Sequence, residues 1–453
     1  MRKYFGTDGI RGEANRELTA ELAMKLGYAL GYQIRKKNPE KKNPKVIMGC
    51  DTRISGYMLR SALTAGLNSM GVSIDFIGVV PTPGVAYITI KKEAAAGIMI
   101  SASHNPAKDN GIKIFAGNGH KLPDEAELEL ERLIDNCEEI FADVLPGDKV
   151  GKFKYAEDEY YMYRDHLLST VAGDFSGMKI ILDAANGSAY RIAKEVFMAL
   201  KAEVVVINDT PNGKNINVKC GSTHPEILSK VVVGYEADLG LAYDGDADRL
   251  IAVDRHGKII DGDKIIAILA VEMKKKGILN NNKVVTTIMS NMGFESFLNE
   301  NNIGLIRANV GDRYVLEKMR NHGLNLGGEQ SGHILLLDYS TTGDGVLTSL
   351  KLVEALRDSK THLDERSAEV IDWPQEMINV RVARDKKATW AENGVITSFI
   401  TEKESEMKGT GRVLVRTSGT EPIIRVMVEG KNGDMVHRIV KDIADLVKKE
   451  LAE

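Results

Sequence analysis

Three aspartates at alternate positions in one short segment are the residues of this chain best suited to bind a cation. Asp244, Asp246 and Asp248 directly follow an apolar run that ends at Tyr243. Two carboxylates about 4 Å apart repel each other by roughly 4 kcal/mol at an effective dielectric near 20, and a hard divalent ion reverses that cost. An EF-hand calcium site is disfavoured because Arg249 stands where that loop needs glycine. Three oxygen ligands, with further positions open to phosphate, predict a Mg²⁺ site.

Ser103 is the candidate nucleophile. It follows the apolar run from Gly97 to Ile100, a placement that exposes a hydroxyl at the carboxyl end of a strand, where open α/β sheets bind ligands. Taken alone, a serine in such a turn is more often a capping residue whose hydroxyl satisfies local backbone groups. The assignment of Ser103 therefore depends on the other segments.

Two glycine-containing segments add groups that bind sugars and phosphate. Residues 327–333 read GGEQSGH and collect a carboxylate, an amide, a hydroxyl and an imidazole, which suit sugar hydroxyls. Residues 416–422 read RTSGTEP, and with Arg425 they offer guanidinium forks, hydroxyls and backbone amides for phosphate. A tight turn between two strands explains the glycine and proline of this second segment but not its concentration of donors. No P-loop or Rossmann G-x-G-x-x-G occurs, so a nucleotide is not the expected phosphoryl donor.

The elements that position these segments predict three α/β domains and a smaller α+β domain. Strand-like runs at 46–48, 72–80 and 95–101 alternate with the helical run 56–69, which indicates βαβ units around a mixed or parallel sheet. This rhythm recurs twice, with strand-like runs at 179–182, 203–207, 238–242 and 283–288. After about Val370 the pattern changes to strands, a charged helix and a terminal amphipathic helix. We expect domains at 1–154 with the serine loop, 155–254 with the metal loop, 255–368 with the sugar loop and 369–453 with the phosphate loop.

Composition narrows the class of protein and its compartment. The chain has 453 residues, of which 43% are hydrophobic and 27% charged, and no stretch approaches the ~20 apolar residues of a membrane span. The N-terminal segment enters a glycine-rich motif at once, without the apolar region of a signal peptide. A net charge of -4 gives no general attraction to nucleic acid. We therefore expect a cytoplasmic protein that binds neither membrane nor nucleic acid.

Five motifs in fixed order resemble those of the α-D-phosphohexomutase superfamily along essentially the whole chain. They are FGTDGIRG at 5–12, SASHNP at 101–106, DGDADR at 244–249, GEQSGH at 328–333 and RTSGTEP at 416–422. Within the superfamily, the opening MRKYFGTDGIRG, the GEQSGH loop, NVGDRY at 309–314 and TTGDG at 341–345 are similar to the branch that acts on glucosamine phosphates. Phosphomannomutase-like relatives often carry histidine where Asp312 stands.

The resemblance implies a role for each loop and four domains, three mixed α/β sandwiches and a smaller α+β domain, around a central cleft. Ser103 would carry the phosphoryl group, and the three aspartates would hold one Mg²⁺ together with a phosphoserine oxygen. Glu329 and Ser331 would bind sugar hydroxyls. The implied clamp for the phosphate that is not reacting comprises Arg416, Ser418, Gly419, Thr420 and Arg425. The residues implied at the reacting end are Arg11, His104, Lys113, Arg249 and His333.

Lys113 is the first candidate for proton management among these residues. A lysine beside a metal and arginines can have a lowered pKa, which allows it to exchange a proton near neutral pH. His333 is the second candidate. Arg11, His104 and Arg249 are expected to neutralise charge or relay protons there.

The implied reaction is a phosphoryl transfer between the 6 and 1 positions of glucosamine. Phosphoserine would donate to glucosamine 6-phosphate, and the resulting glucosamine 1,6-bisphosphate would turn over and return its other phosphoryl group to the serine. The product, glucosamine 1-phosphate, would feed UDP-N-acetylglucosamine synthesis. Small sugar phosphates are the expected partners, and a homodimer is compatible with the sequence.

Three alternatives are left open by the residues themselves. A phosphomannomutase or phosphoglucomutase would share all the chemical groups and differ in contacts to carbon 2 of the sugar. A haloacid-dehalogenase-type phosphatase with Asp244 as nucleophile would leave Ser103 and the Arg416 segment unexplained. A noncatalytic sugar-phosphate-binding regulator would not need an acidic loop beside a serine.

Overall fold

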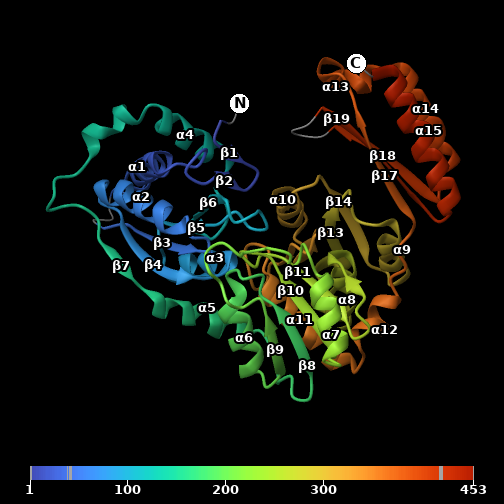
Figure 1. Cartoon of the computed structure of the whole chain (residues 1–453), viewed down its shortest axis with the longest axis horizontal. Coiled ribbons are helices and arrows are strands. Elements are labelled where there is room, and N and C mark those ends of the chain that lie inside the picture. Colours follow the sequence, from blue (N-terminus) through green and yellow to red (C-terminus); the bar gives the residue numbers. More distant parts are fainter. Residues whose placement is uncertain (1–2, 38, 40–42, 418–421, 452–453) are drawn as a thin grey trace. The chain divides into compact units, whose positions relative to one another are not determined.

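Two compact units make up the chain (Figure 1). The computed structural model describes residues 3–37, 39, 43–417 and 422–451. The first unit comprises Met1–Met289 and Ile303–Ala368, and the second comprises Ser290–Asn302 and Glu369–Glu453. The first unit carries three mixed sheets and the second carries one antiparallel sheet. Together with the helices that accompany the sheets, this confirms the predicted fold class of three α/β domains followed by a smaller α+β domain.

The first sheet positions the serine loop. In spatial order its strands are β1 (Phe5–Gly6), β2 (Gly9–Glu13), β6 (Asp109–Ala116), β5 (Ala96–Ile100), β3 (Lys45–Cys50), β4 (Ser73–Val79) and β7 (Phe153–Tyr155). The last four of these strands run parallel, and the first three are antiparallel additions. All five residues of β5 are buried, as expected for a strand covered on both faces.

Helices cover both faces of this first sheet. They are α1 (Ala20–Lys37), α2 (Gly56–Ser69), α3 (Thr82–Lys91) and α4 (Asp124–Asp135), followed by the 3₁₀ turn η1 (Cys137–Asp143). Apolar side chains of α1, α2 and α4 form one core cluster with alternate strand residues such as Val46 and Ile98. Gly97, the neighbour of Ile98, faces α3, where a Cβ would lie 2.3 Å from Thr89 Oγ1. The alternation along β5 therefore separates two apolar layers.

The second and third sheets each combine parallel strands with an antiparallel edge. The second contains β12 (Ile259–Ile260), β11 (Leu250–Asp254), β10 (Leu239–Tyr243), β8 (Lys179–Asp183) and β9 (Glu203–Ile207). The third contains β14 (Gly304–Ala308), β13 (Lys283–Thr287), β15 (Leu326–Gly328) and β16 (Ile334–Leu336). The accompanying helices are η2 (Glu157–Glu159), α5 (Tyr160–Ser169), α6 (Ala189–Ala199), α7 (Glu226–Gly234), α8 (Gly262–Lys275), η3 (Asn280–Asn282), α10 (Asp312–His322), α11 (Gly345–Ser359) and α12 (Leu363–Ala368).

The second unit is built on an antiparallel sheet with strand order β17 (Gln375–Arg381), β19 (Ile423–Gly430), β18 (Gly411–Thr417). Its helices are α9 (Met292–Glu300), α13 (Arg384–Thr389), η4 (Trp390–Glu392), α14 (Gly394–Glu406) and α15 (Gly433–Leu451). Buried residues of α15 recur every three or four positions, from Val436 to Val447, and pack against the strands. This spacing is that of an amphipathic helix with one apolar face.

The loops of interest follow the carboxyl ends of parallel strands. Ser103 comes after β5, the three aspartates come after β10, and Glu329 comes after β15. Such ends are where α/β sheets bind ligands. Among the described residues, no helix has both the length and the apolar character needed to cross a membrane.

Candidate active site

Ser103 is buried and held in an unusual backbone conformation. The residue is only 1% exposed to solvent. Its φ of +51° lies in the left-handed region, which non-glycine residues rarely adopt. Its Oγ donates a hydrogen bond to Asp244 Oδ2 at 2.5 Å and lies 3.3 Å from His104 Nδ1. The serine of the first sheet thus contacts the acidic loop of the second sheet.

A buried ion pair, Asp51 with Arg53, holds the serine loop in place. Arg53 donates to the carbonyl oxygens of Ser103 at 2.8 Å, Asn105 at 2.9 Å and Pro106 at 2.8 Å. Its Nε also donates to Asp51 Oδ2 at 2.9 Å. These four contacts satisfy a guanidinium that is fully enclosed, so neither charge is left unpaired in the interior.

A hydrogen-bond chain continues this support to Ser103 itself. Ser101 Oγ donates to Asp51 Oδ2 at 2.5 Å and accepts from the Ser103 amide at 2.9 Å. Sequence reasoning missed Asp51 and Arg53. The signal was a D-x-R sequence directly after the strand-like run 46–48, because β3 and β5 are parallel neighbours whose carboxyl ends lie at the same edge.

The three aspartates of the acidic loop form a buried cluster. Each offers one carboxylate oxygen that lies within 4.8 Å of the others, so the cluster could hold a metal ion. Within the described part of the chain, Asp246 Oδ1 and Asp248 Oδ1 accept no hydrogen bond. Burial, followed by Asp248 and Asp246, raises the pKa of Asp244 well above its ordinary value. Unsatisfied carboxylate oxygens at this spacing are the donor set that a hard divalent cation requires.

Lys113 lies between these carboxylates and Asp8. Its Nζ is 2.7 Å from Asp246 Oδ2, 3.3 Å from Asp248 Oδ2 and 2.9 Å from Asp8 Oδ2. Burial lowers the pKa of Lys113, but the three carboxylates outweigh burial and raise the pKa well above its ordinary value. The expectation of a lowered pKa considered a neighbouring metal ion and arginines but not these acids, because the sequence did not reveal that three carboxylates surround the ammonium group.

A ring of alternating charges continues from Lys113. Lys121 pairs with Asp8 and with Asp312, and His333 lies 3.7 Å from Asp312 and 3.6 Å from Asp248. Burial lowers the pKa of His333, but Asp248 and then Asp312 and Glu329 raise it to about 9. Sequence reasoning missed Lys121 and did not assign a role to Asp8, because their partners are distant in sequence.

Arg11, His104 and Arg249 complete the described groups around the serine. Arg11 pairs with Asp8. The backbone amide of Arg249 donates to Asp244 Oδ1 at 3.2 Å, and its guanidinium is 3.8 Å from Asp248. Burial, followed by Arg249 and Arg11, lowers the pKa of His104 to about 4. The first unit thus brings together every predicted residue of the reacting end.

The predicted sugar loop lies beside this cluster. Glu329 is half-buried and its Oε1 accepts from the Gly311 amide at 3.1 Å, whereas Ser331 is exposed. The TTGDG segment has glycine at 343 because a Cβ at this position would lie only 2.4 Å from His333 Nε2. Any larger residue would therefore clash with the imidazole in its present position. This contact connects a sequence motif of no assigned role with the position of His333.

Arg416 and Arg425 belong to the second unit and stand directly opposite each other on β18 and β19. Burial, followed by the charge of Arg425, lowers the pKa of Arg416. Arg425 Nε is buried without a hydrogen-bond partner among the described residues. Like charges at directly opposed positions destabilise a sheet. Ser418, Gly419 and Thr420 lie outside the described residues.

Comparisons with known proteins agree with this fold and site. Four models of the phosphoglucomutase/phosphomannomutase family match in order: α/β/α domain I at residues 2–140, domain II at 160–257, domain III at 261–372 and the C-terminal domain at 377–446. The chain therefore belongs to the phosphoglucomutase/phosphomannomutase family.

Curated relatives narrow this class. The phosphoglucosamine mutase of Fusobacterium nucleatum is 66% identical over 451 residues, with 100% of both chains covered. That of Brevibacillus brevis is 51% identical over 454 residues, again with 100% of both chains covered. Within the family, the chain groups with the phosphoglucosamine mutases.

Solved structures at lower identity share the fold. A phosphoglucomutase/phosphomannomutase family protein from Burkholderia thailandensis has a TM-score of 0.80 at 23% identity, covering 98% of this chain and 96% of its own. The N-acetylphosphoglucosamine mutase of Aspergillus fumigatus, in complex with GlcNAc-6P and magnesium, has a TM-score of 0.66 at 18% identity, with coverage of 99% and 96%.

Proposed function

We propose that this protein is a phosphoglucosamine mutase, an isomerase that interconverts glucosamine 6-phosphate and glucosamine 1-phosphate. The observation that carries the proposal is the hydrogen bond from Ser103 Oγ to Asp244, which joins a candidate phosphoryl carrier to a candidate metal loop. The full-length identity of 66% to a phosphoglucosamine mutase supports the choice of sugar. Small sugar phosphates are the substrates implied by the family.

Ser103 is the proposed phosphoryl carrier. Its left-handed backbone and the Arg53 contacts fix the hydroxyl before substrate arrives, and such positioning is a large part of phosphoryl-transfer catalysis. We further propose that Asp244, Asp246, Asp248 and a phosphoserine oxygen hold one Mg²⁺. When bound, this ion would neutralise charge on the transferring group.

Cationic side chains around the serine are proposed to stabilise the transferring phosphoryl group. Lys113, Arg11 and Arg249 place positive charge near the acidic loop. His104 lies against the serine hydroxyl, and His333 contacts the acidic loop from the other side. Fixed charges of this kind act on a developing negative charge without reorganising during the reaction.

Substrate binding is assigned to two further segments. We propose that Glu329 and Ser331 bind sugar hydroxyls and that Arg416, Ser418, Gly419, Thr420 and Arg425 clamp the phosphate that is not reacting. The clamp must accept phosphate on carbon 1 in one half-reaction and on carbon 6 in the other. Glucosamine 1,6-bisphosphate is the proposed intermediate that turns over between the two.

The organisation and setting of the enzyme are proposals as well. We place domain boundaries after residues 154, 254 and 368, and we propose a cytoplasmic enzyme whose sequence is compatible with a homodimer. Its product would feed UDP-N-acetylglucosamine synthesis. Size-exclusion chromatography with light scattering measures the oligomeric state directly.

A coupled mutase assay tests the proposed function. The same enzyme preparation is supplied with glucosamine, glucose and mannose 6-phosphates, each with its 1,6-bisphosphate, in Mg²⁺ and in excess chelator. We expect the highest kcat/KM on glucosamine 6-phosphate and no turnover in chelator. Equal or higher kcat/KM on the mannose substrate would assign the protein to the phosphomannomutase branch, and full activity in chelator would contradict the metal site.

A further inference from the structure

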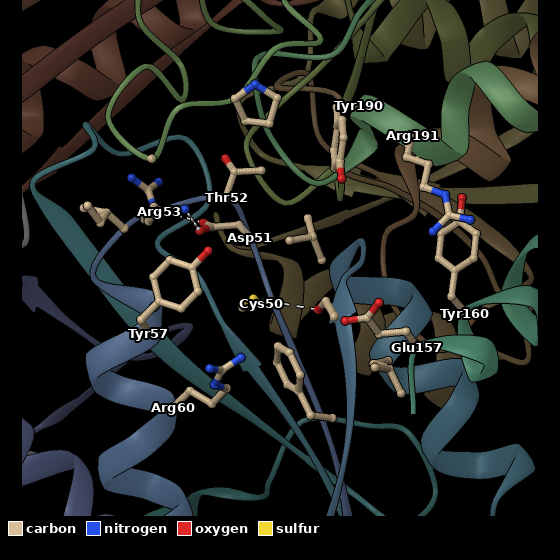
Figure 2. A pocket seen from close by; sticks show the side chains of 18 of the residues that line it. Cys50, Asp51, Thr52, Arg53, Tyr57, Arg60, Glu157, Tyr160, Tyr190 and Arg191 are labelled. Atoms are coloured by element: carbon tan, nitrogen blue, oxygen red, sulfur yellow. Dashed lines mark hydrogen bonds and ion pairs between the residues drawn. The ribbon is translucent and has the colours of Figure 1, made fainter. Parts of the chain in front are cut away.

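A cavity in the first unit, separate from the acidic loop, is lined in part by the Asp51–Arg53 pair. Its volume is about 690 Å³, within the range of ~300 to 1,000 Å³ that is usual for small-molecule sites. Tyr57 and Arg60 enter it from α2, and Tyr190 and Arg191 enter it from α6 (Figure 2). Of the residues assigned above to sugar, metal or phosphate, none that the structure describes lines this cavity.

Arg60 is the unusual cation of the cavity. Its guanidinium lies over four aromatic rings, 4.5 Å from the ring centre of Phe76 and 5.6 to 5.9 Å from those of Tyr57, Tyr155 and Phe153. Within the described residues no carboxylate pairs with it. Two other arginines that lie over tyrosine rings have acidic partners: Arg164 pairs with Asp165 and Arg191 with Glu195. The rings hold the Arg60 guanidinium in place while its donors stay available, which favours an anion.

The rim of the cavity is aromatic and exposed. Tyr57 is 68% exposed and Tyr155 63%, and Ile54 beside them is 52% exposed. Flat aromatic faces next to a guanidinium are the combination on which bases stack while a phosphate is bound. On the opposite side Glu157 offers a carboxylate, which repels a bare phosphate but accepts a hydrogen bond from an amino group.

We propose that this cavity binds a mononucleotide, as a ligand and not as the phosphoryl donor. The phosphate lies at Arg60, near the positive end of α2. The base stacks on Tyr57, and its exocyclic amine donates to Glu157. The phosphate thereby meets Arg60, the base meets the exposed Tyr57 ring, which also contacts the Arg60 guanidinium, and the amine meets the Glu157 carboxylate.

A ligand bound in the cavity affects the serine loop through residues that contact both. Asp51 and Arg53 line the cavity, and the same arginine donates to the carbonyl oxygen of Ser103. Between them, Thr52 donates to the carbonyl oxygen of Asn186, which belongs to the segment after β8. A bound nucleotide therefore stabilises the segment that fixes Ser103. This effect on the serine rests on the proposed function, whereas the binding step does not.

Calorimetric titration of the full chain with AMP, CMP, ribose 5-phosphate and inorganic phosphate tests the site. We expect AMP or CMP, whose bases carry an exocyclic amine, to bind at least tenfold more tightly than the other two probes. Arg60→Met should weaken the nucleotide at least tenfold, and Tyr57→Ala should remove most of its advantage over ribose 5-phosphate. Arg164→Met is the matched control, because this arginine also lies over a tyrosine but outside the cavity, and it should leave binding unchanged.

Hydrogen exchange of the segment 101–110 then tests the connection. Saturating nucleotide should slow exchange there in the unaltered chain and not in Arg60→Met. Absence of nucleotide binding, or binding that Arg60→Met leaves intact, would overturn the site. Equal binding of ribose 5-phosphate or phosphate would overturn the nucleotide class, and binding without a change in exchange would overturn the connection. A mutase assay without nucleotide reports separately on the proposed function.

Discussion

The charged residues of the first unit and those at one end of the second unit's sheet are arranged in opposite ways. Around the acidic loop, Lys113 and Lys121 alternate with Asp8, Asp246 and Asp312, each ammonium between carboxylates. On β18 and β19, by contrast, Arg416 stands opposite Arg425.

A second position on the same two strands sharpens this contrast. Arg412 stands opposite Glu429 and pairs with it at 2.8 Å. The same sheet therefore can pair an arginine with an acid, whereas at 416 and 425 the described residues place two arginines opposite each other. Ion pairs between side chains hold those side chains in one position. Two like charges that lie close together repel each other, and a bound anion lowers that repulsion. We interpret the first arrangement as a preformed reacting end and the second as a site that phosphate completes.

Ser103→Ala should have the largest effect. Removing the proposed carrier should lower kcat by at least ~10³-fold, since the hydroxyl that would accept and donate the phosphoryl group is gone. Ser101→Ala is the matched control in the same loop. It leaves the carrier in place but removes two buried hydrogen bonds, so it should lower stability by ~1 to 3 kcal/mol and activity far less. Ordinary turnover by Ser103→Ala would end the assignment.

Asp246→Asn should have the next largest effect. The change removes a charge from the acidic cluster, and loss of a direct ligand should exceed the ~10 to 100-fold loss seen for outer contacts of metal sites. Mg²⁺ titrations monitored by calorimetry and by activity should both shift to higher concentration. An unchanged metal affinity would mean that the aspartates serve only to hold Lys113.

Arg425→Ala, set beside Arg412→Ala, compares the two facing arginines of the sheet with the arginine that pairs with Glu429. We expect KM for both glucosamine monophosphates to rise ~10 to 100-fold, the worth of one or two charge-assisted hydrogen bonds. Thermal stability should hold or rise, because a repulsion is removed. Arg412→Ala should do the reverse and cost ~3 to 5 kcal/mol of stability, since Glu429 is fully buried.

Escape of the intermediate is a further consequence of the same change. A weakened clamp releases glucosamine 1,6-bisphosphate and leaves Ser103 without its phosphoryl group. Arg416→Ala and Arg425→Ala enzymes should therefore slow during turnover and recover when bisphosphate is added. If only one monophosphate binds poorly and bisphosphate brings no recovery, the two arginines do not form a shared clamp.

Asp344→Asn should have the smallest effect, a change in how the free energy of unfolding depends on pH. Burial raises the pKa of this carboxyl to about 7, opposed by the amide of Leu347 and the hydroxyl of Tyr163. The folded state then holds a proton that the unfolded state has lost, so this group's contribution to stability falls as pH rises from about 4 to 7. Asp344→Asn should flatten that part of the stability profile. An unchanged slope in chemical unfolding from pH 5 to 8 would show that Asp344 is ionised throughout.

The sequence predicted the parts of this molecule that depend on local pattern. The strand-like run 95–101 is β5, and the helical run 56–69 is α2 with the same bounds. Motif order also led to Ser103 and to the three aspartates, whose clustering the structure confirms.

What could not be predicted depends on contacts between distant segments. Lys121 meets Asp312 across 191 positions, and Arg53 reaches the serine loop across some 50 positions. The three carboxylates around Lys113 were missed for the same reason, since they come from segments distant from it in sequence. Composition and spacing carry no information about such pairs until the sheets have placed them side by side.

Phosphorylation of Ser103 tests the central claim most directly. The enzyme is incubated with glucosamine 1,6-bisphosphate, desalted, and chased with glucosamine 6-phosphate in Mg²⁺ or in chelator, and each sample is read by intact and tandem mass spectrometry. We predict one added phosphoryl group on Ser103 that leaves during the chase in Mg²⁺ and stays in chelator. A phosphoryl group found on Asp244 or elsewhere, or one on Ser103 that glucosamine 6-phosphate does not remove, would contradict the mechanism.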